Sequence, residues 1–293
     1  MFTTAVVAAP VLAQVPFSCP GPSPDEWLTL AGTSMRVAVR GAAPPRLDTT
    51  AWSVDKDEEG NDITFYSQAP LAMTAPSRRN LVLALGRISR TNGPPNQPYL
   101  IAFSRNSGET EWEAPISAPV NESFSGVSVD PLHNTAIVCS GKTVAAFRLQ
   151  DGEMVWQRQL TKMIANAMPA ITTDLGKANR LFMTDYDGFS SGAKLYCLNT
   201  DPFDATLNPY QPGEIVWSTP VGSSAGNTPA YLPTCQGGAG LVYVATPGPG
   251  GINVAGVVRA FSAIQDSPSL MWQTSNIQAT GFFGGVAVAP PSA

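Results

Sequence analysis

The chain has 293 residues, a formal net charge of −5, 43% hydrophobic residues and 13% charged residues. The apolar share is sufficient for a buried core and excludes a chain that is disordered throughout, while the low charge excludes a long coiled coil. An acidic balance without blocks of lysine or arginine argues against a nucleic-acid partner, and a single histidine, His133, excludes multi-histidine metal sites.

The N-terminal 15 residues, MFTTAVVAAPVLAQV, are apolar and contain Val11-Leu12-Ala13, a small-residue cleavage pattern. We interpret residues 1–13 as the remnant of a secretory signal peptide that lacks its basic n-region, and residues 14–26 as a linker. An ordinary flexible terminus is the alternative. This interpretation predicts a secreted, periplasmic or cell-surface protein. No apolar run of about 18 residues occurs elsewhere, so we expect no membrane span.

The four cysteines contain no CxxC spacing, which excludes zinc-ribbon and thioredoxin-type sites. Cys139 and Cys197 lie in apolar, strand-like runs, which favours buried free thiols. The spacing leaves the disulfide status of all four open: Cys19, Cys139, Cys197 and Cys235.

Tryptophans mark a repeated unit along the chain. Segment 102–112 (AFSRNSGETEW) matches segment 146–156 (AFRLQDGEMVW), with alanine six residues before glycine and glycine four residues before tryptophan. Segment 213–217 repeats the second half of this pattern, and residues 259–262 with 271–272 repeat it more loosely. The tryptophans recur every 44 to 61 residues, a period that indicates a repeat architecture.

The shortest unit, residues 113–156, contains four short runs rich in Val, Ile, Phe and Trp, separated by turn-forming pairs such as Asp151-Gly152. Four short antiparallel strands per repeat form one propeller blade. The predicted strands are 125–129, 135–139, 143–148 and 153–159. The longer units carry Pro-, Gly- and Asn-rich loops between predicted strands, at 86–98, 201–212 and 246–254.

The repeated glycine and tryptophan have a structural explanation. The glycine lies in the hairpin between the third and fourth strands, where it permits the turn, and the tryptophan packs against the neighbouring blade with a partner for its indole N–H. We predict a blade-docking role for Trp52, Trp112, Trp156, Trp217, Trp272, Gly108, Gly152 and Gly213.

These segments resemble the PQQ-type, quinoprotein alcohol dehydrogenase-like β-propeller repeat, with its pattern Ala-x-Asp-x-x-Thr-Gly-x-x-x-Trp. The resemblance covers residues 27–289, and it implies an all-β propeller of four-stranded antiparallel blades. One departure recurs, because four residues stand where the family has aspartate: Ser104, Arg148, Asn199 and Ser262. Such degenerate repeats are common in non-catalytic relatives.

The phase of the repeat places about four blades within a propeller domain of residues 27–293, and a fifth blade begins at 284–289. Trp52 would belong to a strand that completes the last blade. Related propellers have seven or eight blades, so we expect a truncated ring. Completion by another chain or an irregular smaller ring are the alternatives. The expected blades span about 63–116, 123–160, 166–221 and 227–276.

Three segments could carry chemistry. Residues 55–62 begin like a calcium-binding EF-hand loop, but Tyr66 stands where the bidentate glutamate belongs, so we expect a solvated acidic loop. The Asp-Gly pair in 185–188 indicates a hairpin. His133 is explained by the polarity of its turn, and no GxSxG motif accompanies it. The sequence therefore predicts no catalytic and no metal-ligating residue.

The resemblance also implies what an enzyme of this family would need: PQQ, calcium ligands, an aspartate base and a vicinal Cys–Cys disulfide. The chain has no Cys-Cys pair. We therefore predict an exported, non-catalytic binding or scaffolding module of the cell envelope, without cofactor, that takes protein partners through its loops. The alternatives are a PQQ- and calcium-dependent oxidoreductase fragment and a surface glycan-binding propeller. Further blades absent from this chain are another expected kind of partner.

Overall fold

The computed structural model describes residues 50–65, 72–94, 97–116, 125–188, 190–224, 226–247, 255–274, 277–280 and 285–288, together with Thr29. The predictions for residues 1–13 and 14–26 and for Cys19 lie outside these residues. Within the described part of the chain, no helix is long and apolar enough to cross a membrane.

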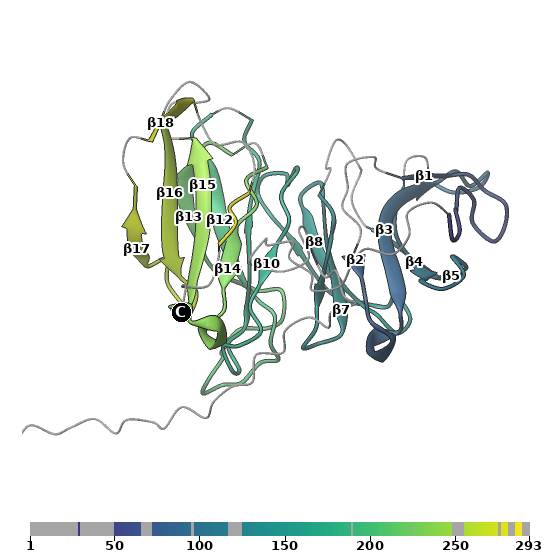
Figure 1. The fold of residues 1–293 in the computed structure, drawn as a ribbon, viewed down its shortest axis with the longest axis horizontal. Coiled ribbons are helices and arrows are strands. Elements are labelled where there is room, and N and C mark those ends of the chain that lie inside the picture. Colours follow the sequence, from purple (N-terminus) through teal and green to yellow (C-terminus); the bar gives the residue numbers. More distant parts are fainter. Residues whose placement is uncertain are drawn as a thin grey trace, which may run out of the picture.

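Four antiparallel sheets, here called blades 1 to 4, follow one another along the chain, and Figure 1 shows them in a row in chain order. Blade 1 contains β1 (Ile63–Phe65), β2 (Ala72–Met73), β3 (Leu81–Ile88), β4 (Pro98–Ser104) and β5 (Thr110–Pro115). Blade 2 contains β6 (Val127–Asp130), β7 (Thr135–Ser140), β8 (Thr143–Arg148) and β9 (Met154–Gln159).

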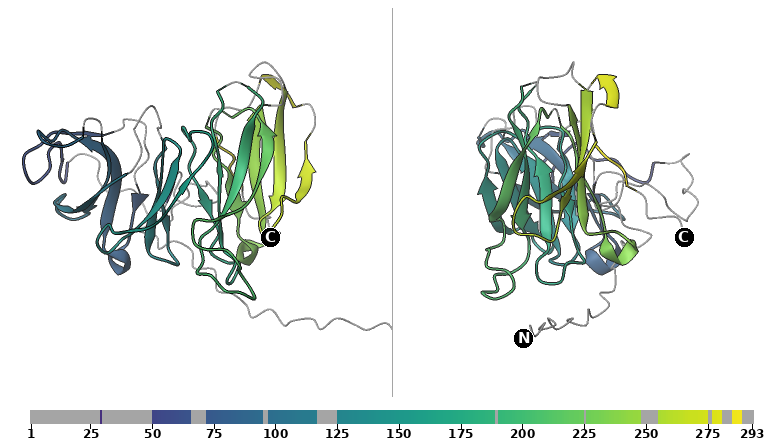
Figure 2. Two further views of the ribbon diagram at one scale, coloured as in Figure 1. Left: turned by 180° about the vertical axis from the view of Figure 1, so that it is seen from behind. Right: turned by 90° about the vertical axis from the view of Figure 1, so that its left-hand side faces the viewer.

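Blade 3 contains β10 (Ala170–Ile171), β11 (Arg180–Thr184), β12 (Ala193–Asn199) and β13 (Ile215–Gly222). Blade 4 contains β14 (Ala230–Leu232), β15 (Leu241–Pro247), β16 (Ala255–Ser262), β17 (Leu270–Gln273) and β18 (Ile277–Thr280). In blades 2 and 3 each strand pairs with its chain neighbour, in the order of a propeller blade. Blade 1 has the order β1-β3-β4-β5 with β2 also paired to β3, and blade 4 has the order β14-β15-β16-β17 with β18 also paired to β16. Figure 2 shows the row from behind and from one end. The predicted all-β class with four-stranded blades is confirmed.

The loop predicted to begin at Gly86 begins later, because β3 continues to Ile88. Gly86 pairs with Phe65 of β1, and a Cβ added at this glycine would lie 3.1 Å from Ile63 Cγ2. The missing side chain therefore lets the short β1 approach β3 closely.

Each pair of neighbouring blades encloses a cluster of buried apolar side chains. A sheet of this size can bury its faces only against its neighbours, and the apolar area removed from water, at roughly 25 cal/mol per Å², is what holds the row together. Buried residues from the two facing blades are Leu100 and Phe147 at the first seam, Ile137 and Leu181 at the second, and Phe182 and Val242 at the third.

The expected features at the two ends of the row differ from the prediction. Trp52 is outside any strand and lies against blade 1, where its indole N–H donates to Arg105 O at 3.0 Å. The structure describes residues 285–288 of the expected fifth blade, and they form no strand. Val286 N–H donates to Thr228 O at 3.3 Å, which ties this segment to the start of blade 4.

Candidate functional site

The repeated glycines and tryptophans meet across the seams between blades. Gly108, Gly152 and Gly213 have φ of +78°, +73° and +77°, in the left-handed region that favours glycine. Each lies beneath the indole of a tryptophan from the preceding unit, so closely that an added Cβ would come within 2.7 Å of a ring atom. The pairs are Trp52 with Gly108, Trp112 with Gly152, and Trp156 with Gly213.

The last two tryptophans depart from this arrangement. Trp217 donates its indole N–H to Gln265 O at 3.1 Å, in a blade 4 hairpin that has no glycine at the turn. Trp272 is 44% exposed and lies 6.0 Å from the Tyr243 ring, on its own blade. Within the described residues, no following hairpin covers Trp272, so the docking role predicted for it is not seen there.

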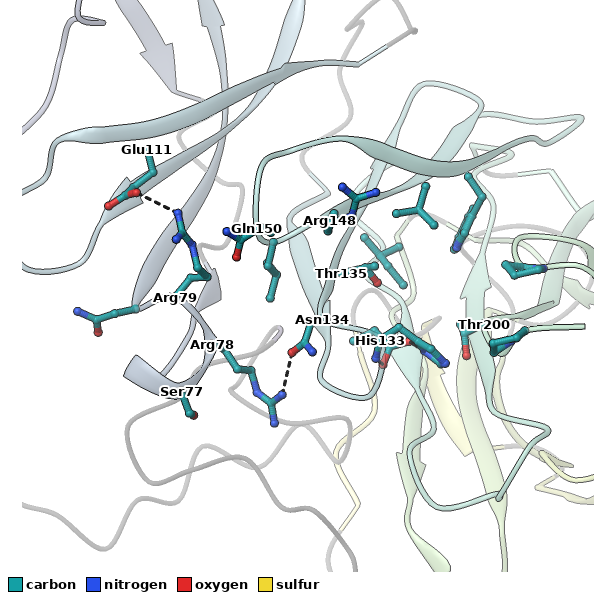
Figure 3. Close-up of a pocket in the computed structure, with 18 of the residues that line it drawn as sticks. Ser77, Arg78, Arg79, Glu111, His133, Asn134, Thr135, Arg148, Gln150 and Thr200 are labelled. Carbon is teal, nitrogen blue, oxygen red and sulfur yellow. Dashed lines mark hydrogen bonds and ion pairs between the residues drawn. The ribbon is translucent and has the colours of Figure 1, made fainter.

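The same end of the sheets, which we call the hairpin face, carries the β2–β3, β6–β7, β8–β9 and β12–β13 connections. A cavity of about 920 Å³ opens on this face. Figure 3 shows it running from Arg79 and Glu111 of blade 1, past blade 2, to Thr200 of blade 3. Its wall includes Arg78, Arg79, His133, Arg148, Trp156 and Thr200.

Two of the three arginines that line the pocket pair with carboxylates. Arg79 lies 3.3 Å from Glu111 Oε2, and Arg148 lies 2.7 Å from Asp151 Oδ2. Arg78 donates to the carbonyl of Pro131 at 2.8 Å. The pocket therefore combines charged, polar and apolar groups, and three of its cationic side chains, Arg79, Arg148 and His133, each face a carboxylate.

His133 joins blade 2 to blade 3. Its Nδ1 lies 2.8 Å from Asp130 Oδ2, and its Nε2 lies 3.1 Å from Asp201 Oδ1. The hydrogen bond with Asp130 and then that with Asp201 raise the pKa of His133 to about 10, against the opposing effect of burial. The sequence explained His133 only as a polar residue of a turn. The contact with Asp201 is 68 residues away along the chain, so the local pattern does not show it.

This clamp predicts a dependence of stability on pH. The pKa of His133 in the folded protein, about 10, exceeds its unfolded value of about 6.5. The two ion pairs of His133 therefore stabilise the fold fully below about pH 6.5, and this stabilisation is lost as the pH rises toward about 10. Urea unfolding at pH 6.5, 8 and 9.5 should show a falling free energy of unfolding. His133→Gln should remove this part of the slope. An identical slope in both proteins would contradict the assignment.

Thr200 supplies an unusual group to the pocket. The residue is 5% exposed, and its Oγ1 is buried without a hydrogen-bond partner in the described part of the chain. Most buried hydroxyls in proteins are paired, and an unpaired one costs about 1–3 kcal/mol. Nothing in the spacing of the sequence distinguishes Thr200 from an ordinary loop residue.

The acidic loop at 55–62 is not fully solvated as predicted. Asp57 is 8% exposed, and its carboxylate accepts backbone hydrogen bonds from Glu59 at 3.0 Å and Asn61 at 2.7 Å. Burial alone would raise the pKa of Asp57, but these bonds and the Asn61 side chain lower it below its usual value. The carboxylate therefore organises the loop, with Arg90 3.6 Å away.

The carboxylates of Asp185 and Asp187 in blade 3 accept hydrogen bonds from the protein itself. Two carboxylates follow β11 at the end of blade 3 opposite the hairpin face. Asp185 accepts from Lys194 N at 2.7 Å and Tyr196 Oη at 3.0 Å, and Asp187 accepts from Ser224 N at 3.1 Å. Both carboxylates are thus already hydrogen-bonded within the protein. No group of three or more His, Cys, Asp and Glu side chains suited to a metal ion occurs in the described part of the chain.

Comparison with known proteins identifies the fold alone. No family model matches the chain, and no curated protein matches it. Two quinohemoprotein alcohol dehydrogenases align with TM-scores of 0.54. The one from Pseudomonas putida HK5 is 13% identical over 86% of this chain and 40% of its own. The one from Comamonas testosteroni is 11% identical over 85% of this chain and 41% of its own.

A europium-containing methanol dehydrogenase aligns with a TM-score of 0.52 and 11% identity, over 86% of this chain and 49% of its own. The chain therefore spans less than half of the length of each of these three structures. Most of the chain has the fold of the quinoprotein-type propellers to which the repeat is similar.

Proposed function

We propose that this chain is an exported, non-catalytic β-propeller of the cell envelope that binds a ligand through the pocket on its hairpin face. The observation that carries the proposal is a cavity of about 920 Å³ whose wall is built by residues of three blades. The wall combines charged groups such as Arg79 with apolar side chains such as Val155, which suits a ligand that has both polar and apolar surface. Because each wall segment ends a strand of a packed blade, the pocket is held in shape before the ligand arrives.

The imidazole in the pocket supports binding rather than proton transfer. Both nitrogens of His133 are held by carboxylates, and its raised pKa keeps the ring protonated near neutral pH. A ring in this state cannot accept a proton as a general base. The thiols of Cys139 and Cys197 are fully buried and burial raises their pKa, so neither is a nucleophile.

A fluorescent label can test the binding function. Gln150 is exposed in the wall of the pocket, and Gln157 is exposed on β9, outside the pocket residues. We expect a dye on Gln150→Cys to respond to an envelope extract of the source cells, and the same dye on Gln157→Cys to stay unchanged. Equal responses, or none at either position, would contradict binding through this pocket.

The non-catalytic part of the proposal has its own test. The protein is mixed with PQQ and Ca²⁺, dialysed, and examined for the absorbance of retained quinone. We expect none to be retained. Stoichiometric retention would favour the oxidoreductase alternative instead.

The cysteines support export. Cys235 is disulfide-bonded, and Cys139 and Cys197 are free and buried. Disulfides persist in oxidising compartments and are rare in the cytosol. Ellman's reagent should therefore find no reactive thiol in the native protein, two of the four in denaturant, and four after reduction. Four thiols in denaturant without reductant would argue against an oxidising compartment.

A scaffolding function has a separate observation in its favour. Three consecutive apolar side chains on β17 are exposed, namely Leu270 at 46%, Met271 at 54% and Trp272 at 44%. β17 is the last strand on the path of blade 4, so within the described residues its outer edge is unpaired. Exposed apolar strand edges of this kind mark sites of protein association.

The contacts inside the chain suggest the chemistry of such a partner. Trp52, Trp112 and Trp156 each lie on a glycine hairpin, so a protein that presents a β-hairpin with glycine at its turn fits Trp272. A partner isolated on immobilised protein should be lost with Trp272→Ala. It should be retained with Leu132→Ala, which removes an exposed apolar side chain on another blade. Loss in both variants, or in neither, would exclude β17 as the docking strand.

A further inference from the structure

Indole N–H groups in this fold bond to backbone carbonyls of the outer hairpin in the next blade. The three pairs are Trp52 with Arg105 O at 3.0 Å, Trp112 with Leu149 O at 3.1 Å, and Trp217 with Gln265 O at 3.1 Å. A peptide carbonyl is therefore the group that the repeat places against an indole N–H.

Trp156 departs from this rule, and its N–H is open to solvent. Its ring lies on Gly213, but no residue in the described part of the chain accepts its indole N–H. Trp156 is half-buried in the pocket wall. Its Nε1 is not among the buried unpaired side-chain atoms of the described residues, which are Arg87 Nε, Arg90 Nε, Ser125 Oγ and Thr200 Oγ1. An acceptor on a ligand can therefore reach it.

The two ends of the pocket differ in chemistry. At the end between blades 2 and 3, the wall has four apolar residues with accessible surface: Val155, Trp156, Pro202 and Pro212. At the blade 1 end the wall is polar, with Ser77, Arg78, Arg79, Asn80 and Glu111, as Figure 3 shows for most of them. A ligand that fills the pocket therefore needs an apolar group at one end and polar groups along its length.

The charges of the wall favour neither an anion nor a cation. Arg79 lies 3.3 Å from Glu111 Oε2, so a ligand carboxylate would meet the like charge of Glu111, and a ligand cation that of Arg79. Asn134 and Gln150 add amide groups, which can both donate to and accept from peptide groups. Hydrogen bonds and apolar contact, more than net charge, are thus available to a ligand.

The polar wall is held in shape by neighbouring hairpins. Asn80 and Asn134 have φ of +53° and +51°, in the left-handed region that few residues other than glycine adopt. Their carbonyls accept from Arg105 N–H and Leu149 N–H, both at 2.9 Å. A bound chain would therefore not have to order these turns, which lowers the entropic cost of binding.

We infer that the pocket binds an extended polypeptide segment, with a large apolar side chain against Val155 and Pro212 and a backbone carbonyl on Trp156 Nε1. The bound segment gives Trp156 the kind of acceptor that the hairpins of this chain give the other three indoles. This inference rests on the proposed binding function, for which it names the ligand class.

Indole N–H resonances in a ¹⁵N-correlated NMR spectrum of the full chain test the inference. The probes are acetylated and amidated peptides of sequence Gly-Ser-X-Ser-Gly, with leucine, phenylalanine or alanine at X. We expect the leucine or phenylalanine peptide to move one indole resonance downfield, the one that is absent from Trp156→Phe. The alanine peptide should bind about tenfold more weakly, because it buries less apolar area.

Two neighbouring residues of β9 supply a matched pair of variants. Val155 and Met154 are 49% and 45% exposed, and of the two only Val155 lines the pocket. Val155→Gln should weaken binding of the leucine peptide about tenfold, and Met154→Gln should leave it unchanged. Equal effects of the two substitutions would exclude the apolar contact.

The indole contact has its own pair of variants. Trp156→Phe removes the open N–H and should weaken peptide binding about tenfold. Trp52→Phe removes an N–H that is already bonded to Arg105 O, away from the pocket residues, and should leave peptide affinity unchanged. Circular dichroism checks that both variants fold. If Trp156→Phe does not fold, the Val155 and Met154 pair still decides.

Other outcomes would overturn the inference in distinguishable ways. If maltose or inorganic phosphate moves the Trp156 resonance and no peptide does, the ligand is a sugar or an anion, and only the proposed binding function survives. If no peptide moves it but the dye on Gln150→Cys responds to an envelope extract, the inference again fails alone. If neither assay responds, both proposals fail.

Discussion

Replacing Arg180 with methionine should lower the free energy of unfolding by about 3 kcal/mol. The Arg180 side chain is 1% exposed, and its guanidinium donates to Asp266 Oδ1 at 3.0 Å in the blade 4 hairpin. It also donates to the amide oxygens of Asn199 at 2.8 Å and Asn208 at 3.1 Å. Removing one partner of a buried ion pair costs about 3–5 kcal/mol. Since Asp266 is half exposed and regains water, the lower end is expected.

Arg148→Met is the matched control for Arg180→Met. Like Arg180, Arg148 is ion-paired, in its case with Asp151 and Glu153, but its side chain is 45% exposed. Water screens exposed ion pairs, so this variant should unfold near the wild-type midpoint. Urea unfolding followed by circular dichroism measures both. Equal losses of stability would show that burial does not set the cost of losing Arg180.

Gly152→Ala should destabilise the protein by about 2–5 kcal/mol. The φ of +73° costs an L-residue roughly 1–2 kcal/mol, and the new Cβ would lie 2.6 Å from Trp112 Cε3. Overpacking of this kind typically adds about 1–3 kcal/mol. Because the ring lies between blades and its N–H is bonded to Leu149 O, it cannot move away without opening the seam. Thermal unfolding should show a clearly lower Tm.

Two variants separate the two costs at Gly152. Gly60 has φ of +84° and nothing within 4 Å of an added Cβ, so Gly60→Ala should show the backbone cost alone, about 1–2 kcal/mol. In a Trp112→Ala background, the steric part of Gly152→Ala should disappear, and the two substitutions should not be additive. Full additivity would mean that the indole does not press on this turn.

The polar contacts between blades fix the positions of neighbouring blades more strictly than the apolar clusters do. Apolar packing is tolerant of small displacements, whereas a charged hydrogen bond requires a defined geometry. His133 with Asp201 ties blade 2 to blade 3, Arg180 with Asp266 ties blade 3 to blade 4, and Asp174 accepts from Tyr231 Oη at 2.8 Å across the same seam. We expect these contacts to set the relative positions of the blades on which the pocket depends.

The strands of blade 2 show how much of the fold could be predicted. The predicted runs at 135–139 and 143–148 correspond to β7 (Thr135–Ser140) and β8 (Thr143–Arg148), because short apolar runs between turn-forming pairs report local burial. Repeat spacing likewise marked Trp112 and Gly152, which meet across the seam. The candidate site was not predicted. The sequence pattern explained His133 as a turn residue and did not distinguish Thr200 from an ordinary loop residue.

The sequence by itself determined the class of fold, the approximate strands and the recurring tryptophan and glycine, because each depends on residues close together in the chain. Tertiary structure alone decided which groups meet across blades. Arg180 and Asp266 are 86 residues apart, and their pairing depends on how two sheets are stacked. It also decided that Trp156, which has the same motif as Trp112, has no acceptor for its indole N–H within the described residues. The Tyr210 carbonyl, which stands where the acceptors of Trp52 and Trp112 stand, accepts from Asn199 Nδ2, and only the folded loop shows this.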